Sequence, residues 1–245
     1  MSIVKRFSKN TKGNDYIVGD LHGTFSKLQL ALNLIGLNEE TDRLFSVGDL
    51  VDRGPESHLA LQWLNKPWFH VVRGNHEQMF IDYHNGTQPA DNYIQNGGAW
   101  AVGLTKEERL PFYDEFCDLP IAIELETDNG LVGIVHADVP INDWDVFVER
   151  LNGQNQQAEQ LIQCAIWSRD RHTYKNKDII KGIKQVVVGH TVVKNPTRLG
   201  NVIYIDTGSV FERTTQQGHN GHGLTIFDVQ SMSTEIFNLP FKEVV

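Results

Sequence analysis

The sequence contains very little cysteine. Its two cysteines, Cys117 and Cys164, stand far apart and outside any CxxC spacing. This excludes a disulfide framework and predicts two buried thiols in a reducing compartment. The sequence also lacks any run of about 20 apolar residues, which argues against a membrane-spanning helix. Residues 1–12 are polar and have no apolar segment of the signal-peptide kind, so we expect a cytoplasmic protein.

Basic residues are scarce relative to acidic ones. The 245 residues include 22 lysines and arginines against 31 aspartates and glutamates, for a formal net charge of -9. A negative surface disfavours nucleic acid and anionic membranes, so we expect neither as a partner. An anionic substrate would need positive charge supplied locally by metals and arginines. Because there is no internal repeat and no linker, we expect one domain spanning residues 1–245.

Three short motifs that begin with glycine stand out in the first third of the sequence. Each follows an apolar, strand-like run, expected at residues 16–18, 44–47 and 69–72. Each places aspartate, asparagine or histidine at the point where that strand ends. The motifs are GDLHG at residues 19–23, GDLVDRG at 48–54 and GNHE at 74–77.

Strand, motif and helix alternate in this part of the chain. Apolar spacing predicts a helix over residues 25–35 with Gly36 as its stop, one opened by Pro55 that reaches Leu64, and one through Met79. The alternation is typical of βαβ units in an α/β fold, whose ligands bind at the carboxyl ends of the strands. Further helices are expected at residues 106–116, 143–151 and 154–167, a hairpin at 121–125 and 131–135, and strands at 186–188, 202–205, 224–227 and 235–237.

The motifs supply candidate ligands for two metal ions. Asp20 and His22 stand two residues apart, so both side chains can point to one side and reach one ion. Asp49 offers two oxygens and a full negative charge, as a ligand between two cations requires. Asn75 offers a neutral carbonyl oxygen to the second ion. Two histidines that follow later strand-like runs complete the set, His136 and His190.

The ligand types indicate both the metals and the chemistry. A mixed set of nitrogen and oxygen donors favours Mn, Fe or Zn over Ca or Mg. Two such ions about 4 Å apart activate water and hold a phosphoryl group. The sequence therefore predicts phosphate chemistry at the ends of its strands.

His76 and Asp52 form a different candidate pair. His76 directly follows Asn75 and is expected to overhang the metal site. An imidazole held by the Asp52 carboxylate can carry a proton and give it to a leaving alkoxide. The alternative is that Asp52 caps the following helix.

Arginines are the candidate phosphate ligands, because a guanidinium matches phosphate oxygens with two parallel hydrogen bonds. Arg53 lies within the second motif, and Arg169 lies in a loop after a long predicted helix. Arg171 is an exposed alternative to Arg169. Arg73 precedes the third motif and either binds substrate or pairs structurally with an acidic neighbour.

Together these segments resemble the metal-dependent phosphoprotein phosphatases. The resemblance rests on GDLHG, GDLVDRG and GNHE, followed by HAD at residues 136–138 and GHT at 189–191. The segment IDTGSVF at residues 205–211 resembles the branch of the family found in bacteria and bacteriophage lambda. The Ser-Ala-Pro-Asn-Tyr-Cys loop of eukaryotic members is absent, so eukaryotic-type regulatory subunits are not expected.

The resemblance implies a calcineurin-like β-sandwich flanked by helices, and serine/threonine or dual-specificity protein phosphatase activity on phosphorylated proteins or peptides. It implies two divalent metal ions, most readily Mn²⁺, with Fe or Zn as alternatives. A hydroxide between the ions would attack phosphorus while His76 protonates the leaving oxygen, and Arg53 and Arg169 would hold the phosphoryl oxygens. The implied ligands are Asp20, His22 and Asp49 for one ion, and Asp49, Asn75, His136 and His190 for the other.

Other functions remain open at this point. A symmetrical diadenosine tetraphosphate hydrolase would share the fold and the metal set, and a catalytically inactive scaffold would share the fold alone. The intact second and third motifs argue against the dinucleotide hydrolase, and the complete set of candidate ligands with its candidate acid argues against the scaffold. Residues 212–223, which carry His219 and His222, are longer than expected for this branch. They predict either a solvated hairpin extension, or a third metal site or a lid.

Overall fold

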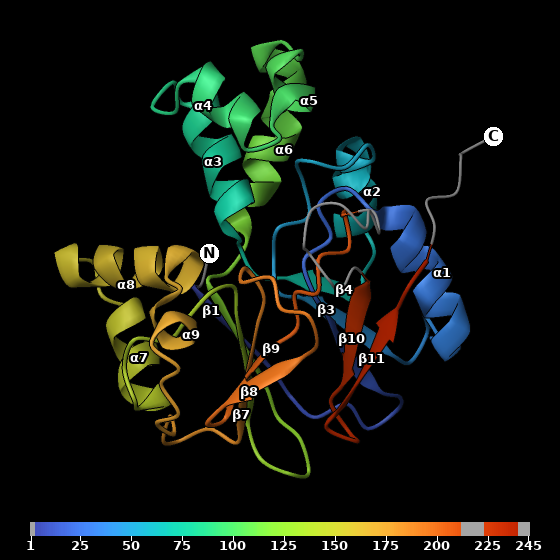
Figure 1. The fold of residues 1–245 in the computed structure, drawn as a ribbon, viewed down its shortest axis with the longest axis vertical. Coiled ribbons are helices and arrows are strands. Elements are labelled where there is room, and N and C mark those ends of the chain that lie inside the picture. The colour runs from blue at the N-terminus through green and yellow to red at the C-terminus, as the bar shows by residue number, and fades with distance from the viewer. Residues whose placement is uncertain (1–2, 212–222, 240–245) are drawn as a thin grey trace.

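Two β-sheets form the centre of the computed structural model, which describes residues 3–211 and 223–239 (Figure 1). One sheet has five strands in the order β11-β10-β2-β3-β4, and the other has six in the order β1-β5-β6-β7-β9-β8. The strands are β1 Val4–Phe7, β2 Asp15–Val18, β3 Arg43–Ser46, β4 Phe69–Val71, β5 Ala122–Leu125, β6 Val132–Val135, β7 Gln185–Val188, β8 Thr197–Leu199, β9 Val202–Tyr204, β10 Leu224–Asp228 and β11 Ser233–Phe237.

Apolar side chains from both sheets meet in one buried layer. Ile17 and Phe45 are paired residues of the parallel strands β2 and β3, and both point into this layer. Ile123, Val187 and Ile203 reach it from the six-stranded sheet. The sheets therefore pack face to face, and the expected α/β β-sandwich is confirmed.

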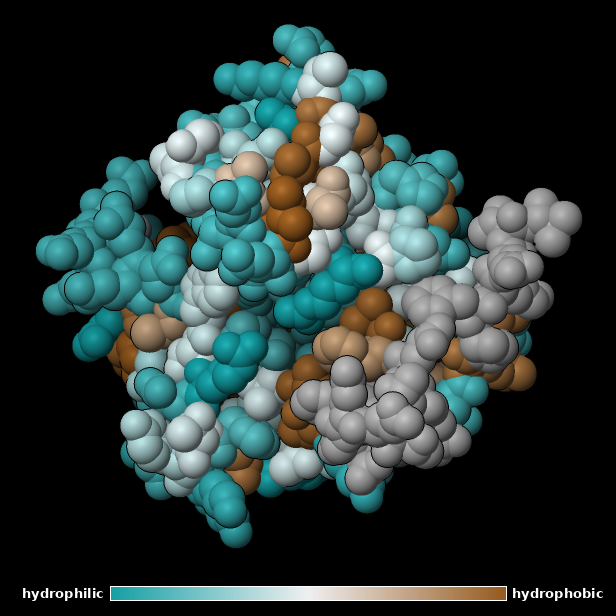
Figure 2. Space-filling view, turned by 45° about the horizontal axis from the view of Figure 1, so that its top comes forward, coloured by the Kyte–Doolittle hydropathy of each residue, from teal (hydrophilic) through white to brown (hydrophobic). Residues whose placement is uncertain are grey.

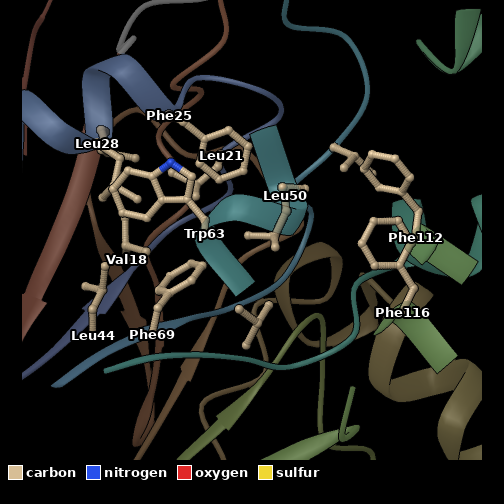
Figure 3. Packing of buried hydrophobic residues seen from close by; sticks show 14 of the residues in the cluster. Val18, Leu21, Phe25, Leu28, Leu44, Leu50, Trp63, Phe69, Phe112 and Phe116 are labelled. Atoms are coloured by element: carbon tan, nitrogen blue, oxygen red, sulfur yellow. The ribbon is translucent and has the colours of Figure 1, made fainter. Parts of the chain in front are cut away.

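Helices cover the outer faces of the sandwich (Figure 1). Val18 and Phe69 of the five-stranded sheet pack with Phe25 of α1 and Trp63 of α2, whose rings stack 5.5 Å apart (Figure 3). Strands β2 and β3 carry apolar side chains on both faces, Ile17 and Phe45 toward the other sheet and Val18 and Leu44 toward the helices, which explains their apolar runs. The helices are α1 Phe25–Ile35, α2 Ala60–Leu64, α3 Asn75–His84, α4 Ala90–Gln95, α5 Ala99–Val102, α6 Lys106–Asp118, α7 Trp144–Leu151, α8 Gln156–Trp167 and α9 Asp170–Thr173, with a 3₁₀ turn η1 Ser57–Leu59.

Helices α3 to α6, residues 75–118, project from the sandwich as a helical arm (Figure 1). Phe80 of α3 packs against Phe112 and Phe116 of α6, with ring centroids 5.9 and 5.2 Å apart. The arm has its own aromatic packing and begins at the third motif, so it is joined directly to the candidate site.

Most of the predicted elements are present, with one correction. Helix α1 spans the predicted residues, and Gly36 follows it with φ of 69°. The helix predicted from Pro55 begins later, as a 3₁₀ turn at Ser57 and as an α-helix at Ala60. The side chain of Ser57 accounts for this difference, because its Oγ accepts a hydrogen bond from Asp52 N and ties Ser57 to the preceding loop. The elements that were not predicted are β1, β8, α4, α5 and α9.

The hydrophilic surface agrees with the composition, whereas the two thiols are more exposed than expected. The face seen in Figure 2 is mostly hydrophilic, and its apolar side chains form separate small groups. Cys117 and Cys164 are free and only partly buried, so the prediction that both thiols are buried is wrong. Across residues 3–211 and 223–239, no helix combines the length and apolar character needed to cross a bilayer.

Candidate active site

Candidate ligands gather where strands of both sheets end. Asp20, Asp49 and Asn75 follow β2, β3 and β4 of the five-stranded sheet. His136 and His190 follow β6 and β7 of the six-stranded sheet. All five side chains are buried. The site therefore lies across one end of the sandwich, at the carboxyl ends of parallel strands, as the sequence predicts.

The backbone at this site is held in unusual conformations. Seven described residues other than glycine have positive φ, and five of them are candidate site residues. A left-handed conformation costs a residue with a β-carbon about 1 kcal/mol or more, so surrounding contacts must hold it. The five residues are His22, Asp49, Asp52, Arg53 and His190.

Glu77 supplies such contacts by joining two motif loops. Its buried carboxylate accepts hydrogen bonds from the N–H groups of Asp49 at 2.9 Å, Leu50 at 2.7 Å and Gly74 at 2.9 Å. Burial and the nearby Asp49 carboxylate raise the pKa of Glu77 to about 7. Glu77 had no predicted role beyond its place in GNHE, because its partners are backbone groups that no side-chain pattern reveals.

Asp49 lies at the centre of the candidate ligands. Its Oδ2 is 3.4 Å from His136 Nε2, 3.7 Å from His22 Nε2 and 3.9 Å from His76 Nε2. Burial would raise the pKa of Asp49, but the imidazoles of His136 and His76 outweigh it and hold that pKa well below its usual range. Two close groups of possible ligand atoms share this carboxylate, one with His22 and His76 and one with His136 and His190.

Backbone carbonyls determine which ring nitrogen of two histidines faces the site. His22 Nδ1 lies 3.0 Å from Val51 O, and His136 Nδ1 lies 2.7 Å from Val47 O. In the neutral imidazole that donates there, Nε2 is an acceptor. His136 Nε2 lies 3.0 Å from Asn75 Oδ1, which also accepts. A cation between facing acceptors stabilises them, so these residues fit a divalent metal.

Asp20 and His190 are connected through the backbone. Both Asp20 carboxylate oxygens accept from His190 N at 3.1 Å. His190 Nε2 lies 3.0 Å from Trp167 O, which leaves Nδ1 free to act as a ligand. Asp20 lies outside the two closest ligand groups of the described residues, and its place on the first ion stays a prediction.

The buried carboxylates of the site repel one another, so positive charge nearby would stabilise them. Burial, together with the carboxylates of Asp206 and Asp49, raises the pKa of Asp20 well above its usual range. Burial raises the pKa of Asp206 to about 6, and Asp49 contributes. Bound cations would relieve this repulsion. Asp206 was seen in the sequence only as part of the DTG segment and was not predicted as a site residue.

His76 and Asp52 form a fully buried pair. His76 Nδ1 lies 2.7 Å from Asp52 Oδ2. Asp52 Oδ1 accepts from Tyr93 Oη at 2.9 Å and from Trp100 Nε1 at 2.7 Å. The helix-capping alternative for Asp52 is wrong, because the turn that follows begins at Ser57 after Glu56 and has no side-chain cap hydrogen bond. Tyr93 and Trp100 lie 41 and 48 residues beyond Asp52, so no local pattern could reveal them.

Two of the candidate arginines reach the site. Arg53 Nη1 lies 2.5 Å from His22 Nε2. Arg169 Nη2 donates to His190 O at 3.4 Å. Both guanidinium groups are thus next to candidate metal ligands.

The other two arginines have structural partners. Arg73 Nη2 donates to the carbonyls of Cys117 at 2.5 Å and Leu119 at 3.3 Å, at the C-terminal end of α6. This favours the structural alternative for Arg73. Arg171 was expected to be exposed, which is wrong: it is 4% exposed and pairs with Asp138 at 3.3 Å. The predicted extension with His219 and His222 lies outside the described residues.

The sequence matches a known family over most of its length. Residues 16–202 match the calcineurin-like phosphoesterases. The chain belongs to this family and is a hydrolase of phosphate esters.

Relatives of two activities are similar to this chain. It is 36% identical to serine/threonine-protein phosphatase 2 of Salmonella typhimurium, over 79% of this chain and 87% of that protein. It is also 36% identical to serine/threonine-protein phosphatase 1 of the same organism, over 85% of this chain and 93% of that protein. It is 41% identical to the symmetrical bis(5'-nucleosyl)-tetraphosphatase of Coxiella burnetii, over 54% of this chain and 44% of that protein.

Solved structures share the fold at low sequence identity. A serine/threonine phosphatase from Saccharomyces cerevisiae superimposes with a TM-score of 0.63 at 15% identity, covering 100% of this chain and 86% of the other. A provisionally assigned diadenosine tetraphosphatase superimposes with a TM-score of 0.65 at 18% identity, covering 96% and 97%. These likenesses bear on the fold alone.

Proposed function

We propose that this protein is a metal-dependent phosphatase that hydrolyses phosphoserine and phosphothreonine in proteins. The observation that carries the proposal is the pair of ligand groups sharing Asp49, with the buried His76–Asp52 pair directed at it. Two bacterial serine/threonine-protein phosphatases that match most of this chain support the choice of substrate.

The residues fit two divalent cations. Asp20, His22 and Asp49 would hold one, and Asp49, Asn75, His136 and His190 would hold the other. The mixed nitrogen and oxygen donors favour Mn²⁺, with Fe or Zn as alternatives. When bound, the two ions supply an activated water and neutralise charge on the phosphoryl group.

The remaining chemistry falls to side chains of the chain itself. Arg53 and Arg169 bind phosphoryl oxygens and orient phosphorus for in-line attack. The Asp52 carboxylate balances the charge of His76 protonated on both nitrogens, and Nε2 then faces the site. His76 gives that proton to the serine oxygen as its bond to phosphorus breaks. A water oxygen bonds to phosphorus on the side opposite the departing serine oxygen and loses a proton, so the products are a free hydroxyl side chain and inorganic phosphate.

Symmetrical dinucleoside tetraphosphate hydrolysis is the second candidate, because the Coxiella burnetii relative is 41% identical over the part it shares. That relative matches only 54% of this chain, and the net charge of -9 suits a long polyphosphate poorly.

A paired assay separates the two candidates. Chelator-stripped protein, with and without added manganese, is offered a phosphoserine peptide and diadenosine tetraphosphate at equal concentration. Manganese-dependent phosphate release from the peptide is the expected result. Preferential formation of ADP would assign the protein to the dinucleotide hydrolases. No activity on either substrate, from protein shown to bind two ions, would refute both assignments.

A further inference from the structure

The helical arm reaches into the active site through two aromatic side chains. Asp52 is completely buried, and its Oδ1 accepts from both Tyr93 Oη and Trp100 Nε1, at 2.9 and 2.7 Å. Its Oδ2 is left to His76 Nδ1 at 2.7 Å. Both donors belong to the segment formed by α4 and α5, and neither is predicted to bind metal or substrate.

Both groups can only donate a hydrogen bond to the Asp52 carboxylate and do not accept one from it. The indole N–H of Trp100 is only ever a donor. Burial and the adjacent Asp52 charge raise the pKa of Tyr93, so its hydroxyl stays protonated. Two permanent donors on one oxygen fix the plane of the Asp52 carboxylate. The direction from which His76 is held is fixed with it.

The same segment also holds the neighbouring arginine. Arg53 N donates to Gly97 O at 3.1 Å. Gly97 has φ of +100°, and a β-carbon there would lie 2.5 Å from Arg53 N. At Gly98 a β-carbon would lie 2.4 Å from the Tyr93 ring. The consecutive glycines therefore let the arm approach the left-handed Asp52 and Arg53 closely enough to hold them.

We propose that Tyr93 and Trp100 are positioning residues for the proton-donating pair, so that the arm determines how well the enzyme expels a strongly basic leaving oxygen. This inference rests on the proposed function, in which His76 protonates that oxygen. A side chain that only satisfies a buried charge would affect stability. A side chain that aims the acid affects the dependence of the rate on the leaving group.

The leaving group provides the test. The serine alkoxide must be protonated as it departs, whereas 4-nitrophenolate is a stable anion and needs little help. In Trp100→Phe and in Tyr93→Phe, kcat for a phosphoserine peptide should fall about 10-fold, the usual effect of losing an outer hydrogen-bond partner. For 4-nitrophenyl phosphate the fall should be less than about twofold. KM should change little for either, because neither side chain touches substrate.

Phe112→Leu is the matched control. The Phe112 ring packs 5.2 Å from Trp100 and 5.9 Å from Phe80 within the arm. This change loosens the packing of the arm without removing a donor to Asp52. It should lower the denaturation midpoint and leave the ratio of the two activities unchanged.

A second readout requires no catalysis. In the metal-free protein the proton between His76 Nδ1 and Asp52 should give a far-downfield NMR resonance that is absent in His76→Asn. It should move upfield in Trp100→Phe and Tyr93→Phe and stay in place in Phe112→Leu.

The outcomes separate the inference from the proposed function. An equal loss on both esters, or an unmoved resonance in both variants, would overturn the positioning role even if wild type is an efficient phosphatase. If wild type hydrolyses neither ester, the proposed function fails, and the resonance alone decides whether the arm positions the pair.

Discussion

Replacing Glu77 by glutamine tests how the bridging carboxylate is held. Glu77 Oε2 accepts from Asp49 N and Gly74 N, and Oε1 accepts from Leu50 N at 2.7 Å. In Glu77→Gln the new amide oxygen can keep the first two hydrogen bonds. The amide NH₂ must then face the N–H of Leu50, so one buried donor loses its acceptor.

The magnitude follows from that single loss. Hydrogen bonds to a charged group contribute about 1.5–3 kcal/mol, and an unsatisfied buried donor costs about 1–3 kcal/mol. We therefore expect Glu77→Gln to lower the free energy of unfolding of the metal-free protein by about 2–4 kcal/mol. Asp49, with φ of 52°, depends on the same carboxylate for its position. Manganese should accordingly bind about 10- to 100-fold more weakly, as is typical when a partner of a ligand is lost.

Glu56→Gln provides the control. Glu56 is also buried, and its Oε2 accepts from Ser26 N, at the start of α1. A glutamine can keep that bond, so stability should fall by about 1 kcal/mol at most and manganese affinity should not change. Urea denaturation of the metal-free proteins and titration calorimetry with manganese measure both quantities. If Glu77→Gln binds manganese as tightly as the wild type, Glu77 does not hold Asp49 in position for the metal.

Four further outcomes are expected. His76→Asn should keep its metal content and lose roughly two to four orders of magnitude in turnover; elemental analysis that finds both metals gone would contradict the acid role. Asp49→Asn should empty or weaken both metal positions, and a crystal structure with two fully occupied ions would show otherwise. Arg169→Ala should raise KM for phosphate esters, so an unchanged KM would remove it from the substrate site. Burial lowers the pKa of His70 in the folded protein from 6.5 to about 4, so as the pH falls the His70 imidazole of the unfolded chain is protonated before that of the folded protein. As the pH falls from 6.5 to 4, the free energy of unfolding of the metal-free wild type should therefore fall by about 1–3 kcal/mol more than that of His70→Gln, as measured by urea denaturation. An equal fall in both proteins would refute this.

Local patterns in the sequence were enough to predict much of the fold. Helix α1 was predicted at its observed bounds, because its apolar spacing and Gly36 both act within a few residues. Strand β1 was not predicted, because Lys5 and Arg6 interrupt the apolar run and its only support among the described strands is parallel pairing with β5, where Val4 lies opposite Ala122.

The candidate site divides in the same way. Asp20, Asp49 and Asn75 could be predicted because each follows a strand within its own motif. Tyr93 and Trp100 could not, since they reach Asp52 only after the arm has folded back onto the second motif. Side chains that hold the site by contacts between distant segments leave no spacing in the sequence.

The order of the site residues along the chain has a consequence for biosynthesis. Four of the six candidate ligands lie in the first 75 residues, but His136 and His190 come much later. Strand β10, Leu224–Asp228, follows all six and pairs with β2, the strand that leads to Asp20. Because the N-terminal part leaves the ribosome first, the nascent chain carries an incomplete set of candidate ligands for most of its synthesis. Phosphatase activity should therefore appear only once β10 has emerged, and ribosome-bound chains that stop short of it should be inert toward phosphate esters.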